Sequence, residues 1–61
     1  MEGLKRKRKE AGHTLKAVGL MVSPKLSAKT IFNYENGTRE PNLSTLKQLA
    51  ELFKCPIEEL L

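Results

Sequence analysis

Apolar residues recur three and four positions apart in several short stretches of this chain, a spacing typical of helices with one buried face. The clearest stretch covers residues 43–53, where the apolar positions are Leu43, Leu46, Leu49, Ala50, Leu52 and Phe53. A shorter one covers about residues 15–22, with Leu15, Val18, Met21 and Val22 on one predicted face. Residues 1–11 and 57–61 show weaker versions of the pattern, and a further helix is expected over about residues 27–35. These stretches predict an all-α fold, a compact bundle of five short helices without strands.

Capping residues bound the two central helices. Thr14 and Ser27 can each accept a hydrogen bond from an unpaired N–H group of the first turn that follows. Pro24 disfavours helix at the residue before it, so the second helix should end near residue 22. Asn36-Gly37 suits the left-handed conformation in which many helices end. The chain from 14 to 37 is therefore predicted to form two helices joined by a turn.

The remaining elements and the core follow from the same pattern. Asn42 or Ser44 should cap the fourth helix, and Pro56 should lie near the start of the last one. Leu4 and Ala11 give the first helix its only clear apolar stripe, and Gly19 predicts a close helix crossing. The predicted core is Leu4, Val18, Val22, Leu26, Ile31, Tyr34, Leu43, Leu46, Leu49, Ala50, Phe53, Ile57 and Leu60.

Composition narrows the classes of function. The single cysteine, Cys55, excludes an internal disulfide and is expected to be a buried small hydrophobe; no Cys/His set suits zinc, and no other cofactor is indicated. His13 is expected to be a partly buried residue between helices. No nucleophile–base set points to an enzyme or to a small-molecule substrate. No stretch of about 20 apolar residues or signal peptide is present, so we expect a cytoplasmic protein.

The charge favours a polyanionic partner. The formal net charge is +4 and the pI is about 9.5. Residues 5–9 form a run of five cations, which could be a solvated helix face, a nucleic-acid patch or a localisation tag. Two short helices with a turn, the second presenting polar and small residues, can place a recognition helix in the DNA major groove. Many small helical proteins also contain such a pair.

Several motifs resemble the Cro/CI-type helix-turn-helix family, the lambdoid phage repressors and their bacterial relatives. The most specific are Tyr34-Glu35-Asn36-Gly37 and Pro41-x-Leu43-x-Thr45-Leu46, and the resemblance covers nearly the whole chain. It implies a single lambda-repressor-like DNA-binding domain over residues 1–61, with a helix-turn-helix unit at about 14–36 and a recognition helix at about 27–35. It also implies double-stranded DNA as the partner.

The resemblance further implies the residues that would contact DNA. Arg8 and Glu35 would form a structural ion pair between the first and third helices. Base contacts would come from Ser27, Ala28, Lys29, Phe32 and Asn33. Phosphate contacts would come from Leu15, Lys25, Asn36, Thr38, Arg39, Asn42, Leu43 and Ser44. The chemistry of the side chains agrees in part, because lysine can donate to guanine, asparagine can pair with adenine, and Ala28 or Phe32 can touch a thymine methyl group.

The sequence departs from the family pattern at several positions. Leu15 stands where relatives usually carry a phosphate-binding glutamine, so that contact would be either lost or replaced by a backbone N–H group. The connection between the second and third helices is about two residues longer than usual. Lys7 and His13 replace common apolar residues. Phe32 lies on a face predicted to be exposed, where it could either read DNA or be drawn into the core.

The sequence is consistent with two functions of different classes. The first is sequence-specific DNA binding by a phage, prophage or bacterial transcriptional repressor; a lone domain would contact a half-site, so a specific operator would need a homodimer. The apolar end formed by Ile57, Leu60 and Leu61 could supply a weak interface. The second is a protein-interaction module of the same fold, an antitoxin or co-regulator with weak or non-specific DNA binding, which the exposed Leu20 and Phe32 would favour.

Overall fold

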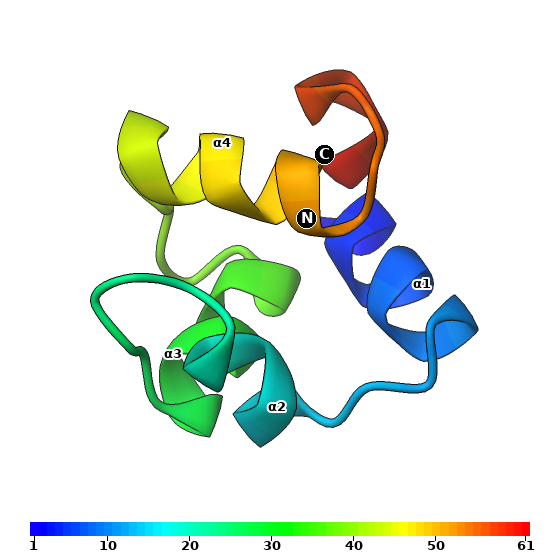
Figure 1. Cartoon of the computed structure of the whole chain (residues 1–61). Helices are drawn as coiled ribbons and strands as arrows, with labels where there is room; N and C mark the ends of the chain where they lie inside the picture. Colours follow the sequence, from blue (N-terminus) through cyan, green and yellow to red (C-terminus); the bar gives the residue numbers. More distant parts are fainter.

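The computed structural model describes all 61 residues and contains four α-helices followed by one 3-10 turn (Figure 1). The elements are α1 (Glu2–Glu10), α2 (Leu15–Leu20), α3 (Ala28–Asn36), α4 (Leu43–Leu52) and η1 (Ile57–Leu60). The all-α class is confirmed, but the fifth α-helix is wrong. Residues 57–60 make a single turn in which the N–H group of Glu59 bonds to the carbonyl of Pro56, three residues earlier. That spacing is the one that defines a 3-10 helix.

Each of α2, α3 and α4 begins at a side-chain cap. Thr14 Oγ1 accepts from the N–H group of Ala17 at 3.0 Å, and Ser27 Oγ accepts from that of Thr30 at 3.2 Å. Of the two candidate caps for α4, the structure uses Asn42, whose Oδ1 accepts from the N–H group of Thr45 at 2.8 Å. An oxygen at this position satisfies one of the donors that a first turn leaves unpaired. The polar residues between the apolar stretches therefore set where these helices start.

Helix α2 is shorter than its apolar pattern predicts. It ends at Leu20, and the Met21 N–H group closes a tighter turn onto the carbonyl of Val18 at 3.0 Å. The helical period therefore no longer applies beyond Leu20, and Met21 is 44% exposed, so its prediction as part of the buried stripe is wrong. Val22 is nevertheless buried, because the chain turns inward after the helix.

The core is smaller than predicted. Fully or almost fully buried apolar side chains come from every helix and from η1, and they are Leu4, Val18, Val22, Ile31, Tyr34, Leu49 and Leu60. Four other predicted core residues pack against this cluster while remaining partly exposed: Leu26, Leu46, Ala50 and Phe53. Leu43 is 62% exposed, because it is the first residue of α4 and lies at the edge of the packed layer. Ile57 is half-buried, Ala11 is exposed and Cys55 is only partly buried, which corrects those three predictions.

The two ends of the chain lie close together, because η1 packs beside the start of α1 (Figure 1). The N–H group of Gly3 donates to the carbonyl of Leu61 at 3.3 Å, and a Cβ atom on Gly3 would fall 1.9 Å from the carbonyl oxygen of Glu59. Leu60 is fully buried in this contact, so within the chain it is a core residue and is not available as a docking surface. None of the helices has the length and apolar character needed to cross a membrane.

Candidate nucleic-acid interface

Helices α2 and α3 pack against each other more extensively than any other pair of elements. The inner face of α3 is closed, because Ile31, Tyr34 and Glu35 are at most 6% exposed. Its outer face presents Lys29, Phe32 and Asn36 to solvent. The second helix of the pair thus has one face committed to the fold and one face free for a ligand, as a recognition helix requires.

The five predicted base-contacting residues differ in their exposure to solvent and in whether their polar groups are already hydrogen-bonded within the protein. Lys29 is exposed, and neither of the two ion pairs in the structure involves it. Phe32 is 51% exposed, so it lies outside the core, and its contact with DNA stays a prediction. Ala28 is half-buried, and Ser27 is exposed, but its hydroxyl is occupied by the cap and by the hydroxyl of Thr30 at 3.0 Å. Side-chain polar chemistry on this face therefore comes mainly from Lys29 and Asn33.

The amide of Asn33 is held by the loop that follows α3. Thr38 Oγ1 lies 3.0 Å from Asn33 Oδ1 and 3.3 Å from the carbonyl of the same residue, and it donates to this pair of oxygens. The N–H groups of Thr38 and Arg39 also bond to the Asn33 carbonyl, at 3.0 and 3.4 Å. The amide oxygen is thereby occupied in part, whereas its NH₂ group stays free to donate. In the free protein, Thr38 orients the side chain of Asn33, and its predicted contact with phosphate stays a prediction.

The predicted phosphate-contacting residues are likewise divided. Lys25 and Arg39 are exposed and have no ion-pair partner, and Leu43 and Ser44 are exposed in the first turn of α4. Asn36 uses its amide to donate to the carbonyl of Phe32 at 2.9 Å, and Asn42 uses its oxygen as the cap of α4. The side chain of Leu15 packs against the core, so only its backbone could face a phosphate.

Arg8 and Glu35 join α1 to α3. Arg8 Nε lies 2.6 Å from Glu35 Oε2 and its Nη2 lies 3.2 Å from Oε1, so the guanidinium group binds the carboxylate through two parallel bonds. The remaining Nη1 donates to the carbonyl of His13 at 3.0 Å. The side chains are only 12% and 3% exposed. Bidentate geometry in a dry setting makes this pair the strongest polar link between the two helices.

The burial of Glu35 leaves the helix-turn-helix region with one sign of exposed charge. Between residues 11 and 39 the charged side chains are Lys16, Lys25, Lys29, Arg39 and Glu35. All four cations are exposed, and the one carboxylate is buried and neutralised by Arg8. A polyanion that approaches this region therefore meets only positive charge, which favours encounter and binding.

Sequence reasoning missed two contacts that lie outside the predicted site. Lys7 Nζ pairs with Glu59 Oε1 at 3.1 Å, which explains why a lysine is tolerated at a position where apolar residues are usual. The side-chain amide of Gln48 on α4 bonds to both backbone groups of Ser23, at 2.7 and 2.8 Å. No local pattern signals either contact, because each joins residues far apart in the chain.

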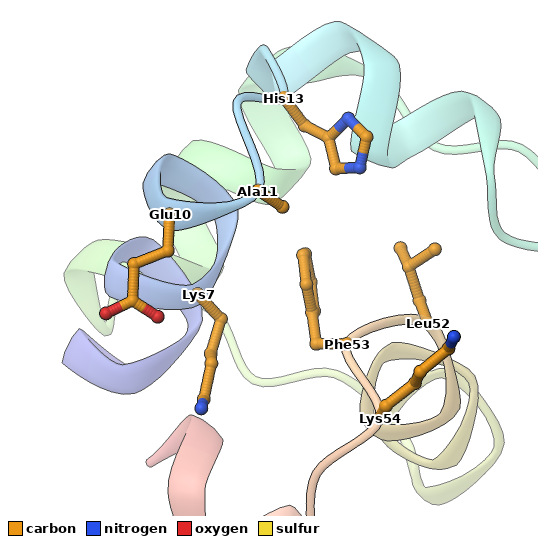
Figure 2. Close-up of a pocket in the computed structure, with 7 residues that line it drawn as sticks. All are labelled: Lys7, Glu10, Ala11, His13, Leu52, Phe53 and Lys54. Carbon is orange, nitrogen blue, oxygen red and sulfur yellow. The ribbon is translucent and has the colours of Figure 1, made fainter.

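A shallow hollow of about 310 Å³ lies between the C-terminal ends of α1 and α4, and its lining is Lys7, Glu10, Ala11, His13, Leu52, Phe53 and Lys54 (Figure 2). The half-buried ring of His13 is tilted by 51° over that of Phe53, with centroids 6.4 Å apart. This agrees with its prediction as a partly buried residue between helices. None of the predicted DNA-contacting residues lines the hollow, so it is separate from the candidate interface.

Comparison with known proteins agrees with this geometry. The family model described as Helix-turn-helix matches residues 4–60, which is nearly the whole chain and includes most of α1 and all of α2, α3 and α4. No curated protein and no solved structure matches the chain. The match includes the buried Arg8–Glu35 pair, the α2–α3 unit and the capped start of α4. The chain belongs to the Cro/CI-type helix-turn-helix family of DNA-binding regulatory domains.

Proposed function

We propose that this domain binds double-stranded DNA sequence-specifically, with α3 in the major groove, and that it acts as a transcriptional repressor of phage, prophage or bacterial origin. The observation that carries the proposal is the exposed charge of residues 11–39, which is entirely positive because Glu35 is buried against Arg8. The outer face of α3 offers Lys29, Phe32 and Asn33 next to this charge.

Specificity would come from three kinds of contact on α3. Lys29 can donate to O6 or N7 of guanine, and Phe32 can pack on a thymine methyl group. Asn33 is restricted by Thr38, which already donates to its Oδ1 at 3.0 Å. Its free NH₂ group therefore acts first as a donor, to adenine N7 or another acceptor of the major groove. Each good contact of this type contributes about 1–3 kcal/mol of discrimination against a wrong base.

Affinity would come from contacts that do not read sequence. Lys25 and Arg39 lie on the loops before and after α3, exposed and without an acidic partner. The N–H groups of Leu43 and Ser44 lie in the first turn of α4, where intrahelical partners are lacking and an anion is favoured. At α2, the side chain of Leu15 is partly buried against the core, which leaves a backbone N–H group as the substitute for the usual glutamine. Such binding should weaken steeply with salt.

The test is selection of bound duplexes from a random DNA pool, followed by competition between the selected duplex and a scrambled one. Wild type should enrich a short motif, and Lys29→Glu should remove the preference for it. Lys54→Glu is the matched control, because it makes the same charge change at an exposed lysine that lines the hollow behind α4. Equal losses in both variants would mean that only overall charge matters. The absence of any enriched motif in wild type would refute sequence-specific binding.

A second function is favoured by a separate observation. Leu20 and Phe32 are each 51% exposed, and Met21 is 44% exposed, so large apolar side chains lie on the surface of α2, α3 and the loop between them. Large apolar side chains at the surface can supply the contacts of a protein-binding interface. A protein-interaction module of this fold, an antitoxin or co-regulator, would keep its partner in Lys29→Glu while losing DNA. The two proposed functions thus predict different results for Lys29→Glu. Protein binding is kept if the domain is an interaction module, and sequence-specific DNA binding is lost if it is a repressor.

Recognition of a whole operator would require two copies of the domain. A two-fold repeat in the selected motif, with half-sites about one helical turn apart, is the expected sign of a homodimer on DNA. Measuring the mass of the complex on such a duplex, in comparison with one half-site, gives the stoichiometry directly.

A further inference from the structure

The loop between α2 and α3, residues 21–27, is attached to α4 by the side chain of Gln48. Gln48 Oε1 accepts from the Ser23 N–H group at 2.7 Å, and its Nε2 donates to the Ser23 carbonyl at 2.8 Å. Both ends of the amide are thus used on one residue, 25 positions away in the chain. A glutamine matches the donor and acceptor of a single backbone residue in this way, as a neighbouring strand would.

The other end of the same loop is attached to α2. The N–H group of Leu26 donates to the carbonyl of Gly19 at 2.9 Å. The contact is so close that a Cβ atom on Gly19 would fall 2.1 Å from the carbonyl oxygen of Leu26. Gly19 is therefore needed for the approach of the loop backbone, which corrects the predicted helix–helix crossing. Ser27, the cap of α3, follows directly.

These contacts determine where α3 begins. Ser23 is bonded to Gln48 of α4, and Leu26 is bonded to Gly19 of α2. The cap of α3 follows Leu26 directly, and α3 itself starts two residues after Leu26. Three of the bonds are 2.9 Å or shorter, so the loop is tied at both ends despite being exposed over most of its length. The direction of the N-terminal end of α3 follows from this pair of anchors.

We propose that Gln48 is a positioning residue for DNA recognition: by holding Ser23, it sets the angle and register at which α3 presents Lys29 and Asn33 to the bases. This inference rests on the proposed function, because it concerns the precision of the same site. The side-chain hydrogen bonds of Gln48 both go to Ser23 and not to a predicted base-contacting residue, so it acts through the loop. A residue of this kind controls preference among sequences more than attraction to the DNA backbone.

Three variants separate this role from stability. Gln48→Leu keeps the approximate size of the side chain and removes both bonds. Gln48→Glu keeps an acceptor for the Ser23 N–H group and loses the donor to the Ser23 carbonyl. Leu52→Ala is the control, because this half-buried α4 residue packs on the core and lines the hollow away from the loop. Each is studied at a temperature at which circular dichroism shows that it is folded.

The measurement is competition between the duplex selected by wild type and its scrambled version, together with amide hydrogen exchange of the free protein. For Gln48→Leu we expect the preference to fall about tenfold, the size of one lost base contact, with binding to scrambled DNA and its salt dependence unchanged. The Ser23 N–H group should exchange faster than in wild type. Gln48→Glu should lie between the two, and Leu52→Ala should keep the wild-type preference despite a lower Tm.

The possible results distinguish a failure of the positioning role of Gln48 from a failure of the proposed DNA-binding function. If wild type selects a motif and Gln48→Leu prefers that motif equally, the positioning role is overturned while the proposed function stands. If Leu52→Ala loses as much preference as Gln48→Leu, stability accounts for the loss and the positioning role is again overturned. If wild type selects no motif, the proposed function fails and the positioning role fails with it.

Discussion

Replacing Arg8 with alanine should destabilise the domain by about 3 kcal/mol. The change removes three donors at once, the two that bind the Glu35 carboxylate at 2.6 and 3.2 Å and the one that binds the His13 carbonyl at 3.0 Å. It leaves a carboxylate that is 3% exposed without its counter-charge. Breaking a buried ion pair from one side costs about 3–5 kcal/mol. The 12% exposure of Arg8 lets some water replace it, which favours the lower end of that range.

This loss is large for so small a protein. At roughly 0.05–0.15 kcal/mol per residue, a domain of this length has a total stability of about 3–9 kcal/mol. In a domain of 60–100 residues, 1 kcal/mol corresponds to a shift in Tm of about 4–8 °C, so Tm should fall by roughly 12–24 °C. Arg8→Lys should cost less, because a lysine keeps the charge but loses the bidentate geometry and the bond to His13.

Thermal unfolding followed by circular dichroism measures these effects. Arg6→Ala is the matched control, because Arg6 is an exposed arginine of the same helix that takes part in neither ion pair. Its Tm should stay within a few degrees of wild type. If Arg8→Ala unfolds at the same temperature as Arg6→Ala, the Arg8–Glu35 pair does not stabilise the fold as stated. A double variant, Arg8→Met with Glu35→Met, should be less destabilised than the sum of its single changes, because no buried charge is left unpaired.

Two further changes test the loop and the caps. Gly19→Ala should lower the free energy of unfolding by about 2 kcal/mol. Overpacking against the Leu26 carbonyl outweighs the roughly 1 kcal/mol that alanine gains in an ordinary helix interior. A gain in stability, measured by urea denaturation, would contradict the close approach of the Leu26 carbonyl to Gly19. Asn42→Ala should cost about 1 kcal/mol through loss of the bond to the Thr45 N–H group, whereas Asn36→Ala, which removes no cap, should cost less in the same assay.

Much of the fold could be predicted because its signals are local. Thr14 and Ser27 have hydroxyl groups directly before a helix, and Gly37 has the positive φ of 78° that its place after α3 suggested. The wrong burial predictions concern residues at the ends of helices, where the apolar period no longer determines which side chains are buried. Met21 continues the apolar period of α2, but the helix stops one residue earlier. Leu43 has the right period for α4, but its place in the first turn leaves it at the surface.

The site was predicted less completely, because its decisive contacts join distant parts of the chain. The residues on the outer face of α3 could be named from spacing and resemblance. The hydrogen bonds that restrict these residues could not be predicted. The bonds from Thr38 to Asn33 and from Gln48 to Ser23 do not affect the apolar periodicity of the sequence. The pairing of Lys7 with Glu59 is similar, because a charge at an apolar position is explained only by an acid near the other end of the chain.

The contact between the two ends of the chain has a consequence for folding during synthesis. Helix α1 is synthesised before α2, α3, α4 and η1, but its neighbour in the core, Leu60, and the Leu61 carbonyl that accepts from the Gly3 N–H group are added more than fifty residues later. The part of α1 that packs on η1 therefore stays uncovered until residues 57–61 have left the exit tunnel, even after α3 has formed. Although most contacts in the four helices are local, the domain should gain its stability in one late step, when the chain closes on itself.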